Sequence, residues 1–184
     1  MTSDTVSTLR SRLRADTAER HARLDRDIST IDIATRPGFV RFMQTHHRAF
    51  RALDAVAPLP ALCDLADRAG RDLDHLGAPE APVPDRGGPL DPLAVDYILQ
   101  GSRLGTKVLK RRWHATDDPQ VRAAGAYFDA PIDAEGWRAT CDALAARPAA
   151  GPAADRVVSD ALRIFDIFGT ALACAPGEKG RRVA

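Results

Sequence analysis

Apolar side chains recur at intervals of three and four residues along most of the chain, a spacing that is typical of amphipathic helices. The spacing is clearest in two segments, one with Phe39, Phe42, Met43, Phe50 and Leu53, the other with Val158, Leu162, Phe165, Phe168 and Leu172. No segment alternates apolar and polar residues as a half-buried strand does. The pattern therefore predicts an all-α fold.

Proline, glycine and aspartate mark the ends of the predicted helices. The first helix covers residues 4–27, the second follows the Pro-Gly break at 37–38, and the third covers 61–76 with Gly77 as its C-terminal cap. Residues 78–89 are rich in Pro and Gly and predict a loop. A fourth helix is predicted to start at Asp91-Pro92 and to end at His114. Three further helices are predicted to start at Asp118-Pro119, at Asp133 and at Gly151-Pro152. We therefore predict a single-domain bundle of about seven helices over residues 1–184, with residues 176–184 as a flexible tail.

Composition narrows the functional classes. The 184 residues include 26 basic and 25 acidic side chains, for a net charge of +1, which does not indicate a nucleic-acid or membrane-surface partner. No apolar run reaches the roughly 20 residues of a membrane span, and the polar N-terminus does not resemble a signal peptide. Three cysteines without a CxxC pair are interpreted as small buried apolar residues, at positions 63, 141 and 174. These features predict a cytoplasmic protein without a membrane span.

His21 is the first candidate for chemistry. It falls on the inward-facing stripe of the first helix, together with Leu9, Leu13 and Thr17. A neutral imidazole is a good axial ligand for haem iron, and Asp25, one turn on, can accept a hydrogen bond from the other ring nitrogen. Arg14 lies two turns earlier, where it could meet a haem propionate. The alternative is a core or boundary histidine with Asp25 as an ordinary surface pair.

Two glycines within a predicted helix are the second candidate. Each interior glycine costs about 0.5–1 kcal/mol relative to alanine. Gly101 and Gly105 are four residues apart and open the same helical face, so the backbone there can approach something flat and large. The alternative is close packing against another helix through small residues.

Taken together, these segments resemble one family. Residues 13–25, Leu-Arg-Ala-Asp-Thr-Ala-Glu-Arg-His-Ala-Arg-Leu-Asp, resemble the proximal helix of haem oxygenases. Residues 97–105, Tyr-Ile-Leu-Gln-Gly-Ser-Arg-Leu-Gly, resemble their distal helix, especially in bacterial members found alongside phytochromes. Residues 71–77, residues 137–138 and the last helix resemble the corresponding haem oxygenase segments more weakly. The resemblance implies a haem oxygenase-type helical bundle in which haem b is both substrate and cofactor. It also implies that O₂ converts the haem to biliverdin, CO and ferrous iron.

The resemblance also implies roles for individual residues. His21 would ligate the iron, Asp25 would orient it, and the distal backbone would cover the haem at Gly101 and Gly105. The other expected haem contacts are Arg14 and Arg138 at the propionates, Phe165 and Phe168 in the pocket wall, and Tyr97, Ser102 and Thr106 in the distal segment. Ser102 stands where some members have aspartate. Thr106 stands where many have a second glycine, so we expect it to add bulk and a hydroxyl near the bound oxygen.

The chain has no flavin or nicotinamide fingerprint, so electrons would come from a partner such as a ferredoxin or a reductase. Three alternatives remain. A haem carrier or sensor without turnover would use the same pocket, and Thr106 favours this alternative because of the bulk it is expected to add near the bound oxygen. A di-iron enzyme would need inward glutamates and Glu-x-x-His pairs, which do not occur in the sequence. A helical interaction module would bind no ligand. His46 and His47 lack fitting carboxylates for a metal site, and Trp137 is expected to be a packing residue.

Overall fold

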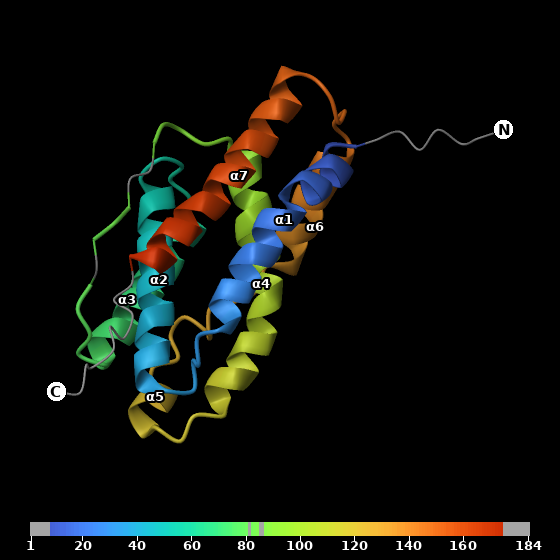
Figure 1. The fold of residues 1–184 in the computed structure, drawn as a ribbon. Helices are drawn as coiled ribbons and strands as arrows, with labels where there is room; N and C mark the ends of the chain where they lie inside the picture. The colour runs from blue at the N-terminus through green and yellow to red at the C-terminus, as the bar shows by residue number, and fades with distance from the viewer. Residues whose placement is uncertain (1–7, 81, 85–86, 175–184) are drawn as a thin grey trace.

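A computed structural model of the chain describes residues 8–80, 82–84 and 87–174, and within them it contains seven helices and no strand (Figure 1). The helices are α1 (Leu9–Ser29), α2 (Arg36–Asp54), α3 (Pro60–His75), α4 (Pro92–His114), α5 (Pro119–Ala123), α6 (Ala134–Ala145) and α7 (Pro152–Ala173). The predicted all-α fold and the predicted number of helices are confirmed.

Most helix boundaries follow the local signals in the sequence, but the predicted break at 37–38 is wrong because Thr35 caps α2 and the helix begins at Arg36. Asp91, Asp118 and Asp133 each cap a helix, and each carboxylate accepts a hydrogen bond from a backbone N–H of the first turn at 2.8–2.9 Å. Gly77 follows α3 with a φ of +60°, a conformation that glycine adopts without steric cost. The backbone N–H groups of Gly77 and of the next residue donate back into the last turn of α3 at 2.9 Å, which is a Schellman motif.

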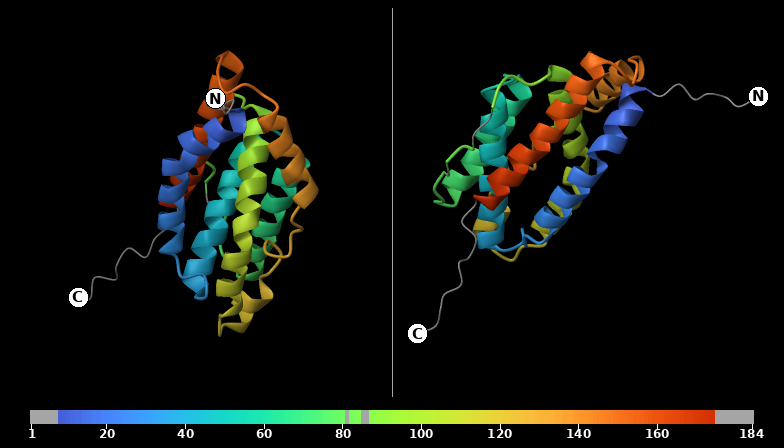
Figure 2. Two further views of the ribbon diagram at one scale, coloured as in Figure 1. Left: turned by 90° about the vertical axis from the view of Figure 1, so that its right-hand side faces the viewer. Right: turned by 45° about the horizontal axis from the view of Figure 1, so that its top comes forward.

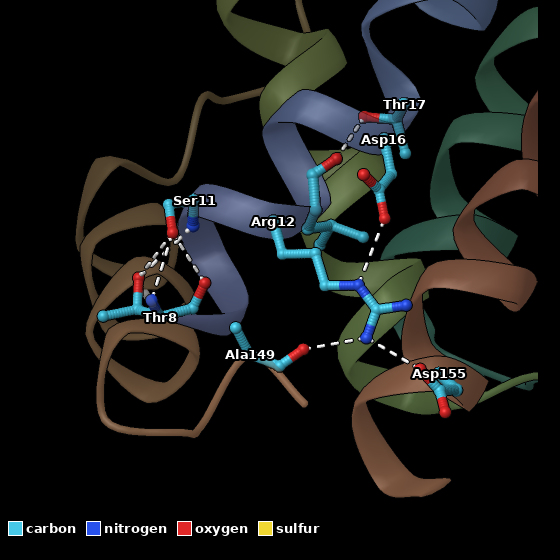
Figure 3. A network of polar contacts seen from close by, with 8 residues as sticks. Thr8, Ser11, Arg12, Asp16, Thr17, Ala149 and Asp155 are labelled. Atoms are coloured by element: carbon cyan, nitrogen blue, oxygen red, sulfur yellow. Dashed lines mark hydrogen bonds and ion pairs between the residues drawn. The ribbon is translucent and has the colours of Figure 1, made fainter. Parts of the chain in front are cut away.

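The first helix begins later than predicted. Thr8 is its N-cap, and a capping box forms because the Ser11 N–H donates to Thr8 Oγ1 while the Thr8 N–H donates to Ser11 Oγ (Figure 3). This reciprocal pair starts the helix at Leu9. Residues 4–7 of the predicted helix and the predicted tail at 176–184 lie outside the described residues.

The helices pack around α7. This helix contacts α1, α2 and α4, while α6 lies against both α1 and α4, and α3 packs on α2 (Figures 1 and 2). Aromatic side chains of α2 and of the α5–α6 connection fill the core, among them Phe39, Phe42, Phe50, Tyr127 and Phe128. Because α1 and α4 share α6 and α7 as neighbours, these two helices are held facing each other.

Arg12 fixes the N-terminal half of α1 to the α6–α7 connection and to the start of α7. Its Nη1 donates to Ala149 O at 2.8 Å and lies 2.7 Å from a carboxylate oxygen of Asp155, while Nε donates to Asp16 at 3.1 Å (Figure 3). One turn beyond Asp16, Arg20 of α1 pairs with Asp166 of α7. These contacts fix α1 against α7 and the α6–α7 connection.

The cysteines are less buried than expected. Only Cys141 is buried, whereas Cys63 is half-buried and Cys174 is exposed. The expectation was wrong for Cys174 because this residue is the C-cap of α7 and lies beyond the packed part of the helix. No helix in the described part of the chain is long and apolar enough to cross a membrane.

Candidate functional site

A cleft of about 750 Å³ lies between α1 and α4, a volume within the roughly 300–1,000 Å³ that is usual for small-molecule and cofactor sites. Helix α6 contributes Trp137 and α7 contributes Phe165. The first of the two main walls is formed by α1 and its N-cap residue, with Thr8, Arg10, Ser11, Arg14, Thr17, Ala18 and His21. The second is formed by α4, with Tyr97, Ile98, Gly101, Ser102 and Leu104. Six predicted site residues therefore meet in one cleft: Arg14, His21, Tyr97, Gly101, Ser102 and Phe165.

His21 lies in the α1 wall of this cleft, and its side chain is 58% exposed. Leu13 and Thr17, two turns and one turn before His21, are buried, so the buried face of α1 ends just before His21. The expectation of an inward-facing histidine is therefore wrong, and so is the alternative of a core histidine, whereas a boundary histidine in a surface pair with Asp25 agrees with the exposure of both side chains. Its Nδ1 lies 3.2 Å from Asp25 Oδ2, and the edge of its ring faces Phe165, 5.7 Å away between centroids. The contact with Asp25 occupies Nδ1 and leaves Nε2 for an external ligand.

Two arginines and a phenol form the most polar end of the cleft. Arg10 and Arg14 are one turn apart on α1 and both are exposed. Tyr97 of α4 is half-buried against the indole of Trp137, with ring centroids 5.6 Å apart. Burial raises the pKa of Tyr97 above its ordinary value, while the nearby positive charges of Arg10 and Arg14 act in the opposite direction. Because no carboxylate belongs to the described residues that line the cleft, this end suits an anionic group.

The two glycines of α4 have different surroundings. A Cβ on Gly101 would lie 3.5 Å from the indole ring of Trp137, so part of the space over Gly101 is filled by a side chain of α6. This agrees with the helix-packing alternative at Gly101. A Cβ on Gly105 would meet no heavy atom within 4 Å, and the residue is exposed. Gly105 itself does not line the cleft, but its neighbour Leu104 does.

The hydroxyls of Ser102 and Thr106 both bond to the backbone of α4. Ser102 Oγ donates to Leu99 O at 2.7 Å and borders the cleft. Thr106 is buried, and its hydroxyl donates to Arg103 O. Thr106 is not a cleft residue, contrary to the expectation that it would crowd a ligand there. It lies one turn beyond the buried Arg103 and therefore shares its inner face of the helix.

Two further predicted residues do not reach the cleft. Arg138 is exposed, and its Nε donates to Ala134 O within α6 at 3.4 Å. Successive residues of a helix differ by about 100° in direction, so with Trp137 facing the cleft its neighbour Arg138 faces solvent. Phe168 is buried in the core, 5.7 Å from Phe50 between ring centroids, because its position on α7 directs it toward α2.

Sequence reasoning missed Arg10 and the cleft contact of Trp137. Arg10 had a usable signal, since it precedes Arg14 by one helical turn and so shares its face. Trp137 had none, because its contact with Tyr97 depends on how α6 packs against α4.

His46 and His47 are both buried in α2. Burial lowers the pKa of His46 to about 4, and its Nδ1 lies 2.9 Å from Phe42 O, so His46 is a neutral core residue at pH 7. Burial also lowers the pKa of His47, whose Nε2 is 3.6 Å from Glu80. Among the residues that the structure describes, no three His, Cys, Asp or Glu side chains are grouped to hold a metal ion.

No model of a known protein family and no curated protein matches this chain.

Proposed function

We propose that the cleft between α1 and α4 binds haem b and that the protein degrades it with O₂ to biliverdin, CO and ferrous iron. One observation carries this proposal. The two segments that resemble the proximal and distal helices of haem oxygenases are more than 70 residues apart in sequence, yet they form the two facing walls of one cleft. A chance resemblance in either segment alone would not require the two segments to meet.

His21 has the chemistry of an axial ligand. An imidazole that donates from Nδ1 to a carboxylate has its lone pair on Nε2, the form that binds iron. The 3.2 Å separation of His21 Nδ1 and Asp25 Oδ2 supports this tautomer. The edge-on contact with Phe165 restricts how the ring can turn. Both neighbours therefore favour one orientation of the imidazole in the cleft.

The arginines provide a binding site for the carboxylates of haem. Arg10 and Arg14 can pair with propionates at the end of the cleft where Tyr97 lies, and guanidinium groups match carboxylates in shape and hydrogen bonding. Arg10 replaces Arg138 in this role, since Arg138 faces solvent. Fixing the propionates at one end fixes which edge of the macrocycle lies deepest in the cleft.

The α4 wall fits the distal side. Haem is the substrate, and its iron supplies the centre at which O₂ is reduced by electrons from an external donor such as a ferredoxin or a reductase. Ser102 uses its own proton in the bond to Leu99 O, so toward the cleft its hydroxyl can accept a hydrogen bond from water but does not supply a proton. No acidic side chain stands on this wall among the described lining residues. Proton delivery would therefore occur through water that Ser102 positions.

The second candidate function is a haem carrier or sensor that does not turn haem over. Its main support in the sequence was Thr106, and this support is weakened because the Thr106 hydroxyl bonds to the backbone on the inner face of α4. The two functions predict different fates for bound haem. The haemin-loaded protein is mixed with ascorbate, or with ferredoxin and its reductase, in air. An enzyme loses its Soret band as biliverdin absorbance grows, whereas a carrier keeps its Soret band and forms no biliverdin.

A further inference from the structure

Arg48 is the least accessible charged side chain described in the protein. Its relative exposure is 0%, and its Nε, Nη1 and Nη2 atoms have no hydrogen-bond partner among the described residues. Burial lowers the pKa of Arg48, yet a guanidinium stays protonated at neutral pH because its ordinary pKa is so high. A buried charge without a partner is strongly destabilising. An anion bound next to the Arg48 guanidinium would therefore stabilise the folded protein.

Arg103 of α4 is a second buried arginine and shows how contacts can offset part of such a charge. Arg103 is also buried, but its Nη2 donates to Ala130 O at 3.0 Å and its guanidinium lies 5.1 Å from the centre of the Tyr127 ring. Arg48 has neither a carbonyl nor an aromatic face among the contacts that the structure describes. Nε and Nη1 of Arg103 are also buried without a partner, so Arg103 is compensated in part, whereas none of the three side-chain nitrogens of Arg48 has a partner among the described residues.

A second arginine stands on the same face of α2. Arg41 is two turns before Arg48, and its Nε is likewise buried without a partner. Side chains of a helix lean toward its N-terminus, so Arg48 leans toward the turn that carries Thr45 and on toward Arg41. Arg48 is also near enough to Cys174, the C-cap of α7, for the two groups to interact electrostatically.

Arg41 borders a groove of about 670 Å³ between α1, α2 and α7, and this groove extends along α7 to Ala173, the residue before Cys174. Arg48 is fully buried and does not line the groove. The other charged side chains in the groove wall are Arg20, Arg23, Asp27 and Asp166. Only Phe165 belongs both to this groove and to the cleft between α1 and α4. A ligand here would therefore be distinct from one in the cleft.

We propose that Arg48 and Arg41 bind a small oxyanion of the phosphate type at the junction of α2 and α7. A phosphate has several acceptor oxygens, so it can accept hydrogen bonds from two guanidinium groups at once. The planar guanidinium group donates such bonds in pairs, a geometry that matches phosphate. Binding would neutralise the buried charge of Arg48 and link α2 to the end of α7. The proposal does not depend on haem binding.

Thermal unfolding of the haem-free protein tests this proposal with inorganic phosphate as the probe. The melting temperature is measured in rising phosphate and in sodium chloride of the same ionic strength. Each tenfold increase in phosphate above its Kd should raise the melting temperature by about 3–5 °C, with no such rise in chloride. A parallel series in acetate shows whether a carboxylate suffices. Equal responses to phosphate and chloride would overturn the proposal.

Variants identify the residues. Arg48→Met should remove the phosphate response, and without phosphate it should melt no lower than the parent because an uncompensated buried charge is gone. Arg71→Met, at an exposed arginine of α3, is the matched control and should keep the full response. If Arg48→Met does not fold, phosphate titration of the parent by calorimetry decides alone, and absence of binding there refutes the site. A phosphate response that persists unchanged in folded Arg48→Met also refutes it.

Discussion

Replacing Gly105 by leucine separates the stability of the protein from its proposed haem binding. Gly105 is exposed in the middle of α4, and an added Cβ meets no heavy atom within 4 Å. Leucine is the better helix former by about 0.5–1 kcal/mol. Since 1 kcal/mol shifts the melting temperature of a domain of this size by about 2–4 °C, the haem-free variant should melt about 1–4 °C higher than the parent.

Haem binding should respond in the opposite direction. Leu104, next to Gly105, already borders the cleft, so a second leucine side chain would project beside the space proposed for the distal face of haem. We expect the haem Kd to rise at least about tenfold, which corresponds to about 1.4 kcal/mol of lost binding free energy. The assay is a haemin titration followed at the Soret band, with circular dichroism of the haem-free protein to verify its helix content.

Gly169→Leu is the matched control. Gly169 is an exposed glycine within α7, and there too a Cβ would meet no heavy atom within 4 Å. It lines the groove on α7 and not the cleft. The control should gain stability in the same way but bind haem like the parent. If Gly105→Leu also binds and degrades haem like the parent, this part of α4 does not cover the haem and the distal assignment fails.

Three further predictions concern other parts of the molecule. Charge reversal at Arg10 or Arg14 should weaken haem binding in a titration, whereas reversal at Arg138, which faces solvent, should leave the Kd unchanged; equal effects at all three would contradict the propionate assignment. Asp25→Asn should retain the haem but bind it up to about tenfold more weakly, because the proximal imidazole loses its carboxylate partner, and an unchanged Kd would argue against that role. His46 has a folded-state pKa of about 4 against 6.5 as its ordinary value, so the unfolded chain binds its proton first and stability is lost as the pH falls from about 6.5 to about 4. Urea unfolding should show a stability difference between pH 7 and pH 5 that is about 2 kcal/mol smaller in His46→Gln than in the parent, and identical differences would refute this reasoning.

The helices could be predicted because their signals are local. Caps such as Asp91 and Asp133, the glycine at 77 and the three-to-four spacing of apolar residues act within one or two turns, and each of these signals is used as expected. The start of α1 differs from the predicted one because the Thr8–Ser11 capping box, a signal present in the sequence, begins the helix at Leu9.

The candidate site could be predicted only in part, because packing against neighbouring helices decides which side chains of each helix point into the cleft. Their motifs identify His21 and Gly101, but the open surroundings of His21 depend on how α6 and α7 hold α1 and α4 on either side of the cleft. Whether Trp137 or Arg138 faces the cleft depends on how α6 packs on α4, and no local pattern encodes that choice. The inner position of Thr106 likewise follows from the rotation of α4 in the bundle.

The axial ligand of bound haem tests the central claim most directly. Resonance Raman spectra of the ferrous haem complex are recorded for the parent, for His21→Ala, and for His21→Ala with added imidazole. The account predicts an iron–imidazole stretching band in the parent, its loss in His21→Ala, and its return with imidazole, since His21 stands in the cleft wall with Nε2 free to bind. An unchanged band in His21→Ala without imidazole would show that another residue ligates the iron and would contradict the account.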